Sequence, residues 1–178
     1  MISGDVFLVR GANFTGAIIS RIGGNDNQFS HLAIVYEEKD GSVMGPENIG
    51  KKYIVESVPD KGLYILPFDE FMTQEKARLA FFRLRHLDAT GKTPEAEIAH
   101  IAAKHMAGFA AQSNVSYNFS MDMSTNPGGK IKSVFCSQAW AEGMAFACTQ
   151  PGIVCEDLSE YISLDRYSAL PSPQHKKM

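Results

Sequence analysis

The sequence has few cysteines: only three among 178 residues, Cys136, Cys148 and Cys155. An odd number cannot close into a complete disulfide framework. One pair, Cys148 with Cys155, can still bridge, but we expect the thiols of a chain made in the cytoplasm to stay reduced. The cysteines and the five histidines show no close-spaced zinc pattern, so we expect neither a metal nor another cofactor.

Long hydrophobic runs and basic runs are also missing. No apolar stretch approaches the roughly 20 residues of a membrane span, so we expect none. The net charge is −3 and the only basic cluster near the end is Lys176-Lys177, which argues against a nucleic-acid partner. Met1 to Val6 lack the positive and apolar regions of a secretory signal. We therefore expect synthesis in the cytoplasm, with a specialised route if the protein acts elsewhere.

The composition that is present suits one soluble globular domain. Hydrophobic residues make up 44% of the chain and charged residues 21%, which is enough apolar material for a core. We expect this domain to span residues 1–170, with a flexible tail over 171–178.

Hydrophobic patterning predicts strands first and helices later. We expect strands over 5–10, 31–36, 53–58, 62–66 and 79–84, and helices over 13–22, from Thr93-Pro94 to about 109, and over 136–147. A loop rich in Ser, Asn, Gly and Pro fills about 112–130. This order predicts an α+β fold.

Cys136 is the strongest candidate nucleophile. It follows apolar Val134 and Phe135 and opens a predicted helix, whose unpaired N–H groups stabilise a thiolate. Cys148 lies at the other end of that helix, where the dipole disfavours a thiolate. A cysteine in an apolar stretch is also commonly a small core residue, so local context leaves both interpretations open.

His31 and Glu56 are candidate partners for Cys136. His31 begins a buried strand, and is either a base or a strand-end histidine with ordinary hydrogen bonds. Glu56 is a carboxylate inside the apolar strand 53–58. It either orients an imidazole, as the third member of a triad does, or faces solvent together with Ile54.

Five segments in one order resemble the circularly permuted branch of the NlpC-type papain-like hydrolases, the YiiX-like group. They are Gly4 to Phe7 (GDVF), Phe29 to Val35 (FSHLAIV), Val55 to Ser57 (VES), Ser116 to Phe119 (SYNF) and Val134 to Trp140 (VFCSQAW). The resemblance covers about residues 4–165. The order of the five segments makes the resemblance specific, because the histidine precedes the cysteine, the reverse of the usual order in papain-like enzymes.

The resemblance implies an antiparallel sheet packed against helices in one permuted papain-like domain. It also implies roles: Cys136 attacks a carbonyl, His31 is the base, Glu56 orients His31, and Tyr117 helps to bind the oxyanion. Tyr117 is alternatively a packing residue of its loop. Two positions depart from the group, which usually has Asp at Asn118 and Glu at Gln138.

Three functions remain in competition. The resemblance favours a cysteine peptidase or amidase that cleaves peptidoglycan stem peptides. As a bacterial effector toxin, such an enzyme would reach a target cell's periplasm through a specialised secretion system and would be held in check by an immunity or inhibitor protein. A lipid acyltransferase or thioesterase with the same Cys–His site is the alternative, with another acyl group as substrate. A non-catalytic binding module is the least favoured, because all three triad residue types are present.

Overall fold

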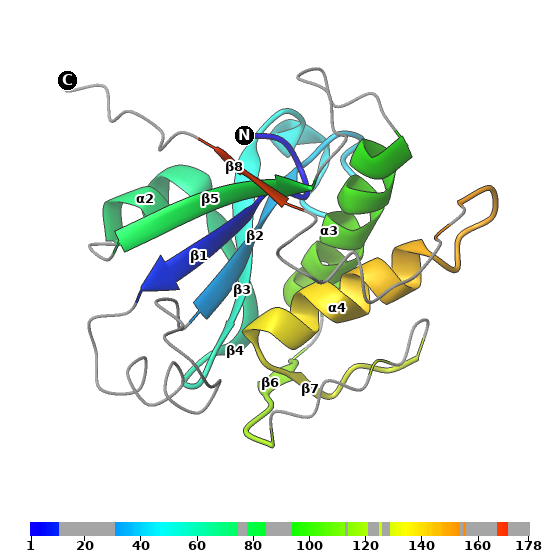
Figure 1. The fold of residues 1–178 in the computed structure, drawn as a ribbon. Coiled ribbons are helices and arrows are strands. Elements are labelled where there is room, and N and C mark those ends of the chain that lie inside the picture. The colour runs from blue at the N-terminus through cyan, green and yellow to red at the C-terminus, as the bar shows by residue number, and fades with distance from the viewer. Residues whose placement is uncertain are drawn as a thin grey trace, which may run out of the picture.

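The computed structural model describes residues 1–10, 31–74, 78–84, 94–112, 114–120, 125, 129–153, 155 and 167–170. The main feature of these residues is a six-stranded antiparallel sheet of strand order β4-β3-β2-β1-β5-β8 (Figure 1). Its strands are β1 (Val6–Arg10), β2 (His31–Glu37), β3 (Lys52–Val58), β4 (Gly62–Pro67), β5 (Arg78–Leu84) and β8 (Tyr167–Leu170). A short parallel pair, β6 (Ser116–Tyr117) and β7 (Ser133–Val134), lies beside it.

Both faces of the sheet are covered, because successive side chains of a strand point to opposite sides. Helices α3 (Pro94–Gln112) and α4 (Cys136–Ala147) lie on one face, where they pack against Val6, Ile34 and Val55. The short helix α2 (Phe68–Gln74) covers the other face through Phe71, which packs in the cluster of Phe7 and Ile54. Figure 1 shows the sheet between α2 and the α3–α4 pair. A 3₁₀ turn, η1 (Pro46–Asn48), lies between β2 and β3.

The two long helices approach each other closely at a glycine. A Cβ on Gly143 of α4 would lie 2.8 Å from the carbonyl oxygen of Ala102 in α3. Ala102 and Ala103 are fully buried there, so small side chains on both helices permit the contact. The position of α4 on the sheet therefore depends on its packing against α3.

The structure confirms an antiparallel sheet packed against helices, the coarse form of the predicted fold. The five expected strands and the two later helices are all present, and α4 begins at Cys136 as predicted. Helix α2 was not predicted, because its seven residues are too few to show a clear helical period. The expected helix over 13–22 and the tail over 171–178 lie outside the described residues. In the described part of the chain, no helix has the length and apolar character needed to cross a bilayer.

The expectation that all three thiols are reduced is wrong for two of them. Cys148 and Cys155 form a disulfide, and Cys136 is the free cysteine. The reason is local geometry. The chain turns back after α4 through hydrogen bonds from the Gln150 amide to the Ala147 carbonyl and from the Ile153 amide to the Gln150 carbonyl. This turn brings the two cysteine Cα atoms to 5.5 Å, within the range that a disulfide spans.

Candidate active site

Three of the predicted site residues meet at one end of the sheet. His31 is the first residue of β2, and Glu56 lies near the end of the antiparallel neighbour β3. Helix α4 packs against both strands and begins at Cys136. The structure thus brings His31 to Glu56, 25 positions away in the sequence, and Glu56 to the region of Cys136, 80 positions away. If His31 were only a strand-end residue and Cys136 only a core residue, their side chains would not need to meet.

The imidazole of His31 lies between an acid and a thiol. Its Nε2 is 2.6 Å from Oε2 of Glu56. Its side chain also shares a hydrogen bond with the Cys136 thiol. Because Glu56 engages Nε2, Nδ1 is the ring nitrogen left for the sulfur. Cys136 and Glu56 are 8% and 6% exposed, so of the two alternatives for Glu56 the solvent-facing one is wrong.

The electrostatics of the site favour a thiolate–imidazolium pair. Burial lowers the pKa of His31, but the hydrogen bonds to Cys136 and Glu56 and their negative charges outweigh it and raise the pKa to about 10. Burial raises the pKa of Cys136, whereas the hydrogen bond and positive charge of His31 lower it, with help from the backbone amides of Leu32 and Ser137. The net pKa of Cys136 falls below that of an ordinary thiol. A nucleophilic sulfur follows from this arrangement.

Tyr64 is a site residue that the sequence did not single out. Its hydroxyl donates a hydrogen bond to Oε1 of Glu56, the oxygen that does not face His31. The two residues are directly paired across the β3–β4 hairpin. The expected strands over 53–58 and 62–66 leave only a short connection between them, and the pairing of Val58 with Gly62 places Glu56 opposite Tyr64. Tyr64 holds the carboxylate in place from the side opposite the imidazole.

Ser57, the last residue of the VES segment, holds the backbone that leads to Cys136. Its hydroxyl donates a 2.7 Å hydrogen bond to the carbonyl oxygen of Val134, two residues before Cys136. The amide of Asn118 donates to the same carbonyl at 3.0 Å. Both bonds fix the backbone that leads into α4. Ser57 and Glu56 point to opposite faces of β3, so adjacent residues hold the cysteine segment and the histidine.

The start of α4 is held by the two residues that depart from the YiiX-like pattern. The Gln138 side-chain carbonyl accepts hydrogen bonds from the Phe135 amide at 3.4 Å and from the Asn118 side-chain amide at 2.9 Å. Gln138 is buried, and Asn118 bridges its loop to the helix. The side chains of Asn118 and Gln138 near Cys136 are therefore neutral amides. Unlike the Asp and Glu that the YiiX-like group usually has at these positions, they place no negative charge near a thiolate.

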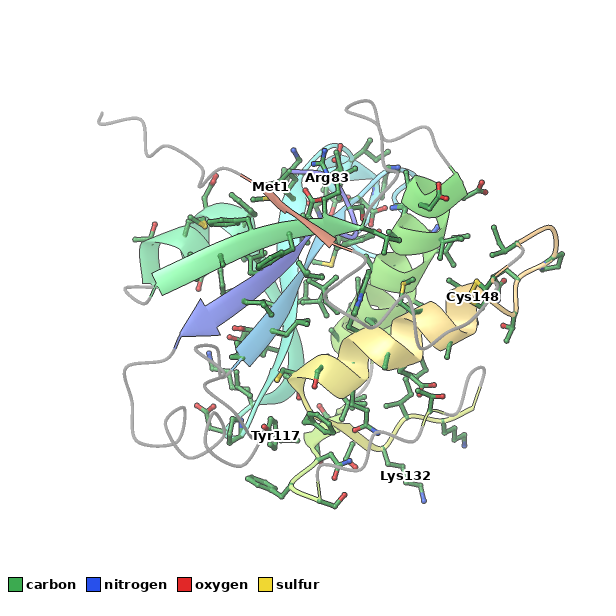
Figure 2. The ribbon with its side chains drawn as sticks, in the orientation of Figure 1. Met1, Arg83, Tyr117, Lys132 and Cys148 are labelled. Carbon is green, nitrogen blue, oxygen red and sulfur yellow. A yellow bond between two sulfur atoms is a disulfide. The ribbon has the colours of Figure 1, made fainter. Side chains whose placement is uncertain are left out.

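The charge of Cys136 acts on the hydroxyl of Tyr117. Burial and the negative charge of Cys136 raise the pKa of its hydroxyl, which keeps the hydroxyl protonated and able to donate a hydrogen bond. In Figure 2, Tyr117 lies at the end of the molecule where α4 begins, and Met1 and Arg83 lie at the opposite end. Its ring meets the Phe119 ring edge-on at a centroid distance of 4.9 Å. Tyr117 thus packs against Phe119 and lies within the electrostatic influence of Cys136.

The GDVF segment lies away from this site. Asp5 is fully buried and forms a two-bond ion pair with Arg83, with Nε 2.7 Å from Oδ1 and Nη2 2.9 Å from Oδ2. Gly4 has a φ of +89°, and a Cβ there would lie 2.4 Å from the Cβ of Ala99. The segment therefore fastens the start of the chain to β5 and α3, which is a structural role.

Among the described residues, no group of three or more His, Cys, Asp or Glu side chains is arranged to hold a metal ion. The carboxylate and imidazole nearest to Cys136 are already bonded to each other. The chemistry available to this site from the described side chains is that of an activated sulfur with a proton carrier beside it.

No known family model and no curated protein sequence matches the chain. Among solved structures, it is similar to the metalloprotein yiiX from Escherichia coli O157:H7, with a TM-score of 0.55 and 16% sequence identity. The match covers 84% of this chain and 67% of that one. At this identity the similarity concerns the fold, and it agrees with the YiiX-like resemblance seen in the sequence.

Proposed function

We propose that this protein is a cysteine hydrolase of the permuted papain-like type that cleaves an amide bond in peptidoglycan stem peptides. One observation carries the proposal: Cys136, at the start of a helix, is hydrogen-bonded to His31, and His31 is held by Glu56. An activated nucleophile, a base within reach and a group that orients the base are the recurring parts of acyl-transfer sites. The proposed membership in the NlpC-type group rests on the ordered motifs, and the fold similarity to the yiiX structure is compatible with it.

The proposed reaction has two halves. The Cys136 thiolate attacks the carbonyl carbon, and the oxyanion accepts hydrogen bonds from the Cys136 amide and the Tyr117 hydroxyl. The C–N bond then breaks as the His31 imidazolium gives its proton to the leaving amine. Water next attacks the thioester while His31 takes one of its protons. The acid product leaves and the thiolate–imidazolium pair is restored.

The proposed setting is the periplasm of a target cell, where peptidoglycan lies. The Cys148–Cys155 disulfide supports this setting, because disulfides persist in oxidising compartments such as the bacterial periplasm. A specialised secretion system would deliver the protein, and an immunity or inhibitor protein would protect the cell that makes it. These are the features of an antibacterial effector toxin.

The test compares wild-type protein with Cys136→Ser, which keeps the size of the side chain but replaces the thiol with a far less acidic hydroxyl. Both proteins are incubated with purified peptidoglycan and, separately, with phospholipid and acyl-thioester substrates, and the products are identified by mass spectrometry. We expect wild-type protein to release stem-peptide fragments with a new amine terminus, and Cys136→Ser to release none.

Two outcomes would change the proposal. Acyl products that depend on Cys136, with intact peptidoglycan, would replace the amidase with the acyltransferase or thioesterase alternative. An absence of products from every substrate, in a protein whose Cys136 is shown to be unreactive toward alkylating reagents, would remove the enzyme proposal altogether.

A further inference from the structure

An exposed aromatic side chain lies on the loop that is hydrogen-bonded to the start of α4. Among the described residues, only Phe119 and Ile49 are large hydrophobic side chains that stay exposed, and Phe119 is the more exposed, at 72%. Single exposed apolar residues are common on protein surfaces and need no explanation by themselves. Phe119 differs from Ile49 in its place, because its ring contacts Tyr117, and Tyr117 lies within reach of the Cys136 charge.

The backbone that carries Phe119 is held on both sides. The Asn118 amide bonds to the Val134 carbonyl, and the Asn118 side chain bonds to Gln138. The Asn118 side-chain oxygen also accepts hydrogen bonds from the backbone amide and the hydroxyl of Ser120, at 3.0 and 2.7 Å. Phe119 is therefore fixed at the tip of a tight turn, with the half-buried Tyr117 behind it. An aromatic ring on a backbone held in this way offers apolar area with little further loss of backbone entropy on binding.

The flanking residues make this surface selective. Tyr117 turns an apolar ring toward Phe119, while its protonated hydroxyl remains available for a polar group near Cys136. A ligand that suits both residues carries a carbonyl at the sulfur and an apolar group a few bonds away. Such a combination of apolar walls and few polar groups is typical of small-ligand sites.

We propose that Phe119 and Tyr117 form an aromatic platform that binds an apolar group of the substrate close to the scissile bond. The platform rests on the proposed function, since it gives that site its substrate preference. The apolar group has two sources: the short alkyl side chains of a peptide, or a longer fatty acyl chain. Both present the same chemistry to the platform and differ in length.

The experiment uses N-alkylmaleimides, from N-methyl to N-hexyl, as probes of the intact oxidised protein. Maleimides add to thiolates, and Cys136 is the free cysteine. The second-order rate constant for each probe is divided by its rate constant with free glutathione, which removes differences in intrinsic reactivity. The variant is Phe119→Ser. The matched control is Ile49→Ser, the same kind of change at the second large exposed hydrophobic residue of the described part of the chain.

We expect the corrected rate to rise with alkyl length in wild type and in Ile49→Ser, and to stay nearly flat in Phe119→Ser. Each additional methylene that the platform half covers should raise the corrected rate constant about twofold. The five extra methylenes of N-hexylmaleimide over N-methylmaleimide should therefore raise it on the order of 30-fold. A rise that ends at ethyl or propyl identifies a short peptide side chain as the ligand group. A rise that continues to hexyl identifies a fatty acyl chain.

Failure of the platform and failure of the proposed function are distinguishable. If Cys136 reacts rapidly with N-methylmaleimide but alkyl length has no effect, or the effect persists in Phe119→Ser, the platform is overturned and the nucleophile stands. If Cys136 reacts no faster than an ordinary buried thiol with every probe, the proposed catalytic site itself is overturned.

Discussion

Glu56 distinguishes this site from one in which a neutral residue orients the histidine. Its carboxylate is buried, bonded on one oxygen to His31 and on the other to the Tyr64 hydroxyl. A full negative charge beside the imidazole contributes to the rise in the pKa of His31 to about 10. The imidazolium therefore persists across the neutral range, and it keeps the Cys136 thiolate stable there.

We predict that Glu56→Gln weakens the thiolate without removing it. The amide keeps the shape of the side chain but loses the charge, so the pKa of His31 falls and its proton is lost at lower pH. Cys136 then loses its cationic partner, and its pKa rises toward the ordinary value of about 8.5. The pH profile of Cys136 alkylation by iodoacetamide should shift upward accordingly. Activity should fall about 10²- to 10⁴-fold, less than with Cys136→Ala.

The control is Glu37→Gln, which makes the same chemical change at the far end of β2 from His31. Its alkylation profile should match wild type. An unchanged profile in Glu56→Gln would show that Glu56 does not set the charge state of His31, and the orienting role would pass to another group.

Helix α4 is the element that places the nucleophile, and it is held at several points. Ser57 fixes the backbone before its first residue, and Gln138 bonds to the amide at its start. Farther along, Gly143 lets α4 lie against α3. Because a helix moves largely as one body, a displacement at Gly143 also displaces Cys136. Packing far from the sulfur therefore contributes to the geometry of the site.

We predict opposite effects of the same substitution at two helical glycines. Gly143→Ala places a Cβ 2.8 Å from the Ala102 carbonyl, an overpacked contact that should lower the free energy of unfolding by about 1–3 kcal/mol. Gly108→Ala in α3 has no atom within 4 Å of its new Cβ, and alanine favours a helix by about 1 kcal/mol over glycine. Urea unfolding measures both. Equal stabilities for the two variants would contradict the close contact between the helices.

At the scale of the whole molecule, the three cysteines divide into two kinds. Cys148 and Cys155 are joined after the end of α4, while Cys136 at its start is free and buried. The Cys148–Cys155 disulfide is the pair whose formation depends on an oxidising environment, and Cys136 is the cysteine with a thiol that can act as a nucleophile. This division fits the proposed hydrolase, which would act in an oxidising compartment with its reactive thiol unpaired.

We predict that location decides toxicity. Wild-type protein expressed in the bacterial cytoplasm should leave growth unchanged, whereas the same chain directed to the periplasm by an added signal sequence should cause lysis. The reason is that the proposed substrate lies outside the inner membrane. Growth curves and microscopy measure the effect, and periplasmic Cys136→Ala should be harmless because no acyl-enzyme forms without the thiol.

Two results would count against this prediction. Toxicity in the cytoplasm that depends on Cys136 would point to a lipid or protein substrate inside the cell. Lysis by periplasmic Cys136→Ala would separate the damage from catalysis.

Local patterns in the sequence predicted β1 to β5, the two long helices and the candidate site residues, but not α2, β6, β7 or β8. Alternating apolar residues predicted the strands, the Thr93-Pro94 start predicted α3, and Cys136 was recognised because helix periodicity begins there. The order of the motifs suggested a permuted papain-like site. These conclusions depend on neighbours within a few positions, which is the range over which backbone propensity and side-chain period act.

Only the tertiary structure decided between the alternatives that those patterns left open. Whether Glu56 faces solvent or His31 depends on which strands pair and on what covers each face of the sheet, and these are long-range contacts. The contact of Phe119 with Tyr117, the bond from Tyr64 to Glu56 and the Cys148–Cys155 bridge join residues close in sequence, and they depend on the exact geometry of local turns. The approach of His31 to Glu56 and Cys136 depends on distances across the folded chain. A one-dimensional pattern carries no such distances, because residues far apart in sequence become neighbours only when the core has formed.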